Sequence, residues 1–288
     1  MFNLATSLIA ACLIAGQAPE PDADIAIIID DIGYDYANGR DAVELNHLFA
    51  YAVLPFSPYA KDLARLANRL GKNVIVHLPM EADSHNHALG PGALLMEMSE
   101  LEIGTAVSNS VAAVPYAVGI NNHMGSRMTR ETDAMTWLMR AIHEHGKLFF
   151  VDSRTTSDSV AFRSALAADV AATKRDVFID NVKSRDAIEQ QLSVLIDRAR
   201  TNGHALGIAH PHAVTVDVLR SWQPEESGVR IIPLEQYVVN YRRDSDGRNI
   251  NTPEKLSGPA SATECGDERE HASATKYPDA PGQRTKHP

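Results

Sequence analysis

Between residues 24 and 240, short apolar runs alternate with segments of helical periodicity, and this alternation restricts the fold more than any other feature. Several runs are continuous Val, Ile, Leu and Ala, which is typical of parallel strands covered on both faces. The predicted strands are 25–29, 50–54, 74–78, 117–120, 148–151, 177–179, 205–209 and 229–232, and the predicted helices include 60–70, 100–114, 131–145, 185–202 and 215–222. Strand–helix alternation repeated about seven times predicts an α/β fold with a parallel sheet, either closed into a barrel or doubly wound.

Polar and ionisable residues follow nearly every predicted strand. In both architectures, ligands bind at the carboxyl ends of the strands. The sequence therefore predicts a functional site at this edge of the sheet. The residues in question are Asp30 and Asp31, His77, residues 121–127, residues 152–156, Asp180 and Asn181, and His210 to His212.

The adjacent pair Asp30 and Asp31 is the most specific of these features. Neighbouring carboxylates repel each other, so a cation or a shared proton is expected to separate their roles. One carboxylate can bind a metal ion while the other accepts a proton. A solvated turn after the strand is the alternative interpretation.

His77 and His123 could complete a metal site with one of these aspartates. Two imidazoles and one carboxylate leave positions open on zinc, or on a similar divalent ion, for water and substrate. Taken singly, each histidine is also compatible with a structural role. Asn122 and Ser126 are of the small or amide type that suits close packing around ligands.

His210 precedes a proline and is the candidate general acid. Asp152 could orient this histidine or the substrate, and capping a helix is an equal alternative. Arg127 and Arg154 could hold a substrate anion or pair with nearby carboxylates.

Composition and missing motifs exclude several classes of protein. The chain has 37 acidic and 27 basic residues and a net charge of −10, which argues against a dedicated nucleic-acid binder. Its two cysteines cannot build a disulfide framework or a cysteine-rich zinc site. It contains no dinucleotide-binding glycine motif, P-loop or Gly-x-Ser-x-Gly motif, so neither a nucleotide cofactor nor a serine hydrolase is expected.

The two ends of the chain differ from the body. Residues 1–18 are apolar and uncharged and end in small residues, which predicts a signal peptide and export to the periplasm or envelope. Residues 9–12 also resemble a lipobox ending at Cys12, and a buried N-terminal helix is a further alternative. Residues 243–288 are almost free of bulky apolar side chains, which predicts a disordered polar tail. A single domain is predicted over residues 24–241.

Six motifs together resemble the divergent polysaccharide deacetylase family, in the expected order over residues 24 to 241. This family is similar to the metal-dependent polysaccharide deacetylases, and the resemblance implies an irregular (β/α) barrel of about seven parallel strands. The motifs are DDIG at 30–33, HLPME at 77–81, GPGALL at 90–95, NHMGS at 122–126, FVDSR at 150–154 and GIAHP at 207–211.

The resemblance also implies roles for the residues at the strand ends. Asp30 would be the catalytic base and His210 the acid, and Asp31 would bind the metal together with His77 and His123. The related deacetylases usually take both histidine ligands from one His-x-x-x-His or similar segment. No second histidine follows His77 at that spacing, so His123 from the next strand end is expected to complete the set.

We therefore expect a hydrolase of the cell envelope that removes N-acetyl groups from a polysaccharide. The bond that it cleaves would be a non-peptide C–N bond. The expected cofactor is a divalent metal ion, with zinc first among the candidates. The expected partner is a glycan, with no nucleic acid. One alternative is a catalytically silent glycan-binding or scaffold protein that retains the fold. A metal-dependent hydrolase of another substrate would use the same site residues.

Overall fold

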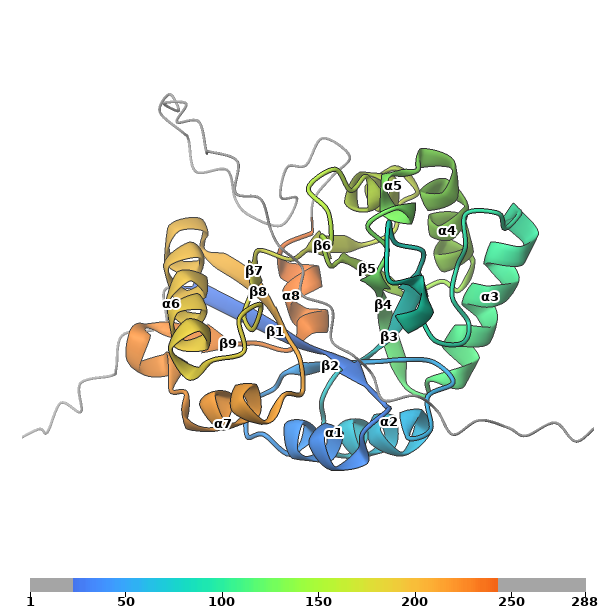
Figure 1. Ribbon diagram of the computed structural model, residues 1–288. Helices are drawn as coiled ribbons and strands as arrows, with labels where there is room; N and C mark the ends of the chain where they lie inside the picture. The colour runs from blue at the N-terminus through green and yellow to red at the C-terminus, as the bar shows by residue number, and fades with distance from the viewer. Residues whose placement is uncertain (1–22, 243–288) are drawn as a thin grey trace, which may run out of the picture.

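The computed structural model describes residues 23–242, in which parallel strands alternate with helices (Figure 1). The predicted signal peptide and polar tail lie outside the described residues. The strands are β1 (Ala23–Ile32), β2 (Ala50–Val53), β3 (Val74–Met80), β4 (Ala117–Met124), β5 (Phe149–Asp152), β6 (Ala172–Lys174), β7 (Val177–Phe178), β8 (His204–Ala209) and β9 (Val229–Ile231). The α-helices are α1 (Tyr36–Val43), α2 (Ala60–Arg69), α3 (Glu100–Ala113), α4 (Thr132–Glu144), α5 (Ala161–Ala167), α6 (Arg185–Asn202), α7 (Ala213–Ser221) and α8 (Leu234–Asn240).

The strands form one parallel sheet in the order β6-β5-β4-β3-β2-β1-β8-β7, and β9 pairs with the first residues of β1. No ladder joins the end strands β6 and β7 within residues 23–242. The chain itself crosses this gap in two residues: the Arg175 N–H donates to the Asp152 carbonyl, and the Asp176 N–H donates to the Leu206 carbonyl, each at 2.9 Å. We call this crossing the seam. The predicted irregular (β/α) barrel is confirmed, with the seam as its irregularity.

Alternate side chains of β1 point to opposite sides of the sheet, as the pleat of a strand requires. Ile25, Ile27 and Ile29 pack in the large core between the sheet and the helices. Ala26 and Ile28 belong to a second apolar cluster, with residues of β2, β3, β5 and β8. Both faces of the strand are therefore buried, which explains its unbroken apolar run.

Helix α8 closes one end of the barrel. Its residues Leu234, Tyr237 and Val238 pack in the inner cluster with the strands, and α8 lies in the middle of the ring of strands (Figure 1). The buried Tyr237 hydroxyl lies 2.7 Å from His204 Nδ1. Side chains thus fill this end of the interior, and the pocket opens at the carboxyl ends of the strands.

Five of the eight α-helices, α2, α3, α4, α6 and α7, match predicted segments within one or two residues. Helices α1, α5 and α8 and strand β6 were not predicted, because each is eight residues or shorter and carries too few apolar positions to show a period. In residues 23–242, none of the helices has the length and apolar character needed to cross a bilayer.

The packing of α8 at the closed end of the barrel gives a stability prediction. Replacing the fully buried Tyr237 by Ala leaves a void and should lower the free energy of unfolding by about 3 kcal/mol or more. Val239 lies on the same helix but is 61% exposed, so Val239→Ala should change it by less than about 0.5 kcal/mol. Denaturant unfolding of both variants checks this, and equal losses would show that α8 does not close the barrel.

Candidate active site

The inward-facing strand positions whose apolar side chains fill the barrel are followed by ionisable residues at its open end. Asp30 lies two residues after the inward-facing Ile28, and His77 lies two residues after Ile75. In the same way, His210 follows Ile208. Each therefore occupies the next position on the inner face of its strand. The polar site rests directly on the apolar interior.

Asp31 would point away from this interior in a regular strand, because it follows the inward-facing Asp30. Its backbone instead has a φ of 58°, in the left-handed region, and both carboxylates line the same pocket. The next turn requires a glycine at position 33, where φ is 136° and a Cβ would lie 1.9 Å from Ser57 Oγ. The local chain turn after β1 thus brings two adjacent carboxylates to one site.

A bulge in β4 directs His123 inward. Val74 pairs with Ala117, but the next residue of β3, Ile75, pairs with Gly119, so Val118 is an extra residue. Beyond this bulge, Asn121 pairs with His77 and His123 with Pro79. Val118 packs with the inner apolar cluster. In a strand without a bulge, Ile120 and Asn122 would then also face inward, and His123 would face outward.

These elements surround a pocket of about 310 Å³ at the carboxyl ends of the strands. All five residues predicted as catalytic groups or ligands line it, from β1, β3, β4 and the end of β8. They are Asp30, Asp31, His77, His123 and His210.

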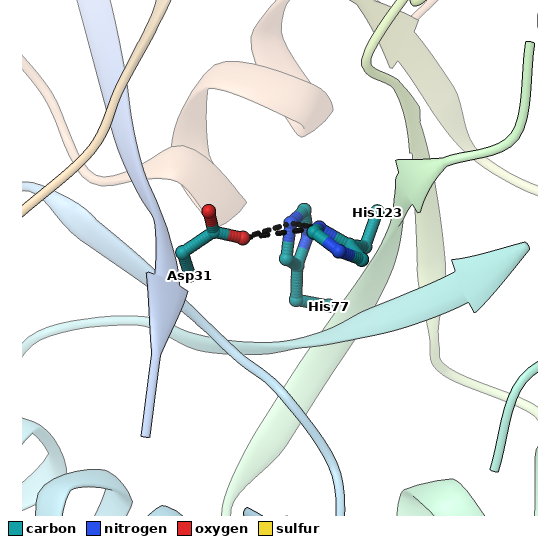
Figure 2. Close-up of side chains that lie close together, drawn as sticks. All are labelled: Asp31, His77 and His123. Carbon is teal, nitrogen blue, oxygen red and sulfur yellow. Dashed lines mark hydrogen bonds and ion pairs between the residues drawn. The ribbon is translucent and has the colours of Figure 1, made fainter. Parts of the chain in front are cut away.

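Three possible ligand atoms converge in this pocket (Figure 2). Asp31 Oδ1 lies 3.2 Å from His77 Nε2 and 3.0 Å from His123 Nδ1, and the two nitrogens are 3.1 Å apart. Ligand atoms about 2.0–2.1 Å from one tetrahedral zinc ion are about 3.3 Å apart, close to these values. With both rings neutral, the triangle presents lone pairs from every corner, an arrangement that a cation stabilises. The three residues therefore fit a divalent metal ion.

Asn121 orients one of these rings. Its Oδ1 accepts a hydrogen bond from His77 Nδ1 at 2.7 Å, which leaves the Nε2 lone pair facing Asp31. Its Nδ2 donates to Asp30 Oδ1 at 2.8 Å and to Ser153 Oγ at 3.2 Å. One buried amide thus ties the predicted base to a predicted ligand.

The two aspartates differ in their electrostatic surroundings. Burial raises the pKa of Asp30, and the neighbouring His77, His210 and Asn121 offset this only in part. Burial would also raise the pKa of Asp31, but His123 and His77 outweigh it and hold that pKa well below its usual range. Asp31 is the better permanent anion and Asp30 the better proton acceptor, which is the division of roles expected from the pair.

His210 is held by Asp180, a residue that was not among the predicted site residues. Asp180 Oδ2 accepts from the His210 N–H at 2.7 Å and from Thr215 Oγ1 at 2.9 Å, and Asp180 Oδ1 accepts from His210 Nδ1 at 3.0 Å. Burial alone would lower the pKa of His210, but Asp180, with Asp31 and Asp30, raises it to about 9. The imidazole is therefore cationic at neutral pH and can donate a proton.

The suggestion that Asp152 orients His210 or the substrate was wrong. Asp152 is buried away from the pocket, where its carboxylate accepts from the Arg154 N–H and Ser159 Oγ, each at 2.8 Å. The inward positions of β5 are Phe149, Val151 and then Ser153, so Asp152 points to the other face.

Of the other candidate residues, Asn122, Ser126 and Arg154 line the pocket. The Asn122 side chain donates to the Met124 carbonyl and accepts from the Ser153 N–H, each at 2.8 Å, so it ties neighbouring strand ends together. Arg127 does not line the pocket. Its guanidinium pairs with the Glu81 carboxylate, which was one of the two alternatives.

Several residues that line the pocket, or that contact its lining, were not singled out from the sequence. Asn121 and Asp180 were visible only as members of polar strand ends, with no signal for their partners. Phe178, Arg175, Lys183 and His212 also line the pocket. Arg175 lies in the seam and Phe178 lies just after it, and the position of the seam depends on a three-residue strand that the sequence pattern does not reveal.

Comparison with known proteins now places the chain. The family model of the divergent polysaccharide deacetylases matches residues 27–238. The chain belongs to this family. It is 39% identical over 221 residues to the uncharacterized protein YibQ of Escherichia coli (strain K12), covering 76% of this chain and 69% of the relative. An uncharacterized protein of Haemophilus influenzae (strain ATCC 51907 / DSM 11121 / KW20 / Rd) is 33% identical over 215 residues, covering 75% and 74% of the two chains.

Among solved structures, this chain resembles the uncharacterized protein ATU2773 from Agrobacterium tumefaciens C58. The TM-score is 0.71 at 21% identity, over 77% of this chain and 91% of the other. At that identity, the similarity supports the shared fold.

The converging ligand atoms predict metal binding. Zinc or cobalt should bind to the metal-free protein, and His123→Gln should weaken binding at least about 100-fold because one of three ligands is lost. Asn121→Ala should weaken it about 10–100-fold through the orientation of His77. Calorimetric titration measures both, with His87→Gln, an exposed histidine outside the pocket, as the control. Equal affinity in all four proteins would refute the site.

The Asp180 contacts predict a pH effect. Because the pKa of His210 is raised from 6.5 to about 9, its contribution to stability is complete below pH 6.5 and is lost as the pH rises through about 9. In Asp180→Asn, the His210 pKa should fall. NMR titration of the imidazole in the metal-free protein measures this, with the Asp186→Asn variant in the first turn of α6 as control. An unchanged pKa would mean that Asp180 is not responsible.

Proposed function

We propose that this protein is a metal-dependent hydrolase that removes N-acetyl groups from a polysaccharide of the cell envelope. The observation that carries the proposal is the convergence of Asp31, His77 and His123 within 3.2 Å, in one pocket with Asp30 and His210. Membership of the divergent polysaccharide deacetylase family supports a polysaccharide as the substrate. A general base and a general acid in one pocket with a candidate metal site suit the hydrolysis of an amide.

Asp31, His77 and His123 would hold the ion, and zinc suits one carboxylate and two imidazoles. A bound divalent ion supplies a Lewis acid that polarises the acetyl carbonyl and makes a water molecule more acidic. Asn121 contributes by fixing the His77 ring so that Nε2 is free to bind.

Asp30 acts as the general base in this proposal. Its burial raises its pKa, so its carboxylate accepts the proton of the attacking water more readily than an exposed aspartate would. The Asn121 amide holds Asp30 Oδ1 at 2.8 Å, which keeps the carboxylate oriented while the proton moves.

His210 acts as the general acid. It is cationic at neutral pH, and Asp180 fixes the ring through Nδ1, so the proton on Nε2 is the one offered to the pocket. Transfer of this proton to the sugar nitrogen lets the nitrogen leave as a neutral amine when the C–N bond breaks. Asp180 then stabilises the orientation of the neutral ring.

Export of the protein is part of the proposal. An envelope polysaccharide lies outside the cytoplasm, and residues 1–18 have the apolar composition of a signal peptide.

The assignment of Asp30 predicts a loss of turnover without a loss of structure. Asp30→Asn should lower kcat by about 10²–10⁴-fold, because it removes the proton acceptor but not the metal ligands. Acetate release from N-acetylated oligosaccharides, with added zinc, cobalt or nickel, measures this. Asp83→Asn, an exposed aspartate paired with Arg130, is the control and should keep full activity.

The same assay separates the alternatives. If the metal-loaded protein releases no acetate from any N-acetylated glycan, the proposed hydrolase is wrong. A catalytically silent glycan-binding protein would instead bind the glycan without releasing acetate, and Asp30→Asn would change nothing that the assay measures.

A further inference from the structure

The rim of the pocket is basic, although the chain as a whole carries a net charge of −10. Arg154, Arg175 and Lys183 line the pocket. The carboxylates that line it are Asp30, Asp31 and Asp180, and each is already engaged by Asn121, by the two ligand histidines, or by His210 and Thr215. Positive charge at the rim is therefore not neutralised by the lining carboxylates.

The three cations gather on one side of the pocket, around the seam. Arg154 follows β5, Arg175 lies in the seam itself, and Lys183 lies in the connection from β7 to α6. The Phe178 ring lies in the same wall, with the Arg175 guanidinium 5.2 Å from its centre. A substrate bound at the metal ligands would meet this wall on its seam side.

The backbone at Arg154 is held in an unusual conformation. Its φ is 49°, in the left-handed region that non-glycine residues seldom adopt. The Asp152 carboxylate accepts from the Arg154 N–H at 2.8 Å, and Arg175 Nη2 donates to the Arg154 carbonyl at 2.8 Å. Arg175 also donates through Nε to the Ser153 carbonyl at 2.7 Å. Arg175 thus serves as a clamp on this turn, and backbone conformations of this kind concentrate at functional sites.

Arg154 and Lys183 have charges that no carboxylate compensates. Within residues 23–242, neither side chain forms an ion pair with a carboxylate, and the guanidinium of Arg154 donates to a carbonyl, that of Ser157, at 3.3 Å. Arg154 is partly buried and Lys183 is exposed. A guanidinium and an ammonium at the mouth of one pocket are the groups that bind carboxylate or phosphate oxygens.

We propose that the substrate glycan carries an anionic group, a carboxylate or a phosphate, which Arg154 and Lys183 bind beside the N-acetylated sugar. This inference rests on the proposed function, since it names the substrate class of that site. A neutral chain of N-acetylglucosamine offers no anionic partner for these two cations. Arg154 and Lys183 are therefore specificity-determining residues, and Arg175 is a positioning residue that holds the Arg154 turn.

Equilibrium binding to the full-length Asp30→Asn protein tests the proposal without turnover. Calorimetry compares three oligosaccharides of equal length: neutral chitohexaose, a hyaluronan hexasaccharide with alternating glucuronate, and a phosphodiester-linked N-acetylglucosamine oligomer. At least one anionic oligosaccharide should bind about tenfold more tightly than chitohexaose at low salt. The difference should shrink as salt is added, because exposed charges are screened. Whichever of the two anionic oligosaccharides binds more tightly identifies the anion as the carboxylate or the phosphate.

The matched variants test the residues. Adding Arg154→Gln and Lys183→Gln together should abolish the preference, so that the anionic chains bind this variant no more tightly than chitohexaose does. Lys61→Gln with Arg69→Gln removes the same charge from the exposed surface of α2 and should keep the preference. Equal binding of neutral and anionic chains, no binding of either anionic chain, or a preference that survives Arg154→Gln/Lys183→Gln would each overturn the proposal. Acetate release plays no part in this result, so failure of the hydrolase assignment is seen separately.

Discussion

The pleat of the parallel strands decides which side chains enter the interior of this barrel, and the site depends on that alternation. The same inward rows that carry Ile28, Ile75 and Ile208 continue into Asp30, His77 and His210. Because the apolar rows exclude water below, the ionisable groups above them are desolvated. Folding and chemistry are thus coupled, since the packing that stabilises the sheet raises the pKa of Asp30, while His123 and His77 hold the pKa of the neighbouring Asp31 down.

Buried charge in this site is balanced by specific neighbours. Asn121 links Asp30 to His77, and Asp180 accepts two hydrogen bonds from His210 and a third from Thr215. Burying unpaired charges would cost several kcal/mol each, so these amide and hydroxyl groups are needed for the fold to tolerate the site. The residues that support the chemistry therefore also stabilise the protein in which it takes place.

Much of this could be predicted from the sequence. Continuous apolar runs showed the parallel sheet, and polar strand ends brought Asp30, Asp31, His77, His123 and His210 to one place. The sequence could not show which face each side chain occupies, because the register of a strand and its bulges depend on neighbouring strands. Asp152 was misjudged for this reason, and Asp180 was not recognised as the partner of His210. Strand β6 and helix α8 are too short to produce a periodic signal.

The bulge at Val118 has a consequence for how such sites diverge over evolution. One inserted residue in β4 reverses which side chains face inward beyond it, so His123 enters the pocket and Asn121 reaches His77 and Asp30. A single-codon insertion or deletion at this point would therefore exchange the inward and outward rows of β4, moving a metal ligand out of the site and Ile120 out of the large core. Aligning distant relatives by residue identity alone would miss such an exchange, whereas aligning them by strand phase would reveal it.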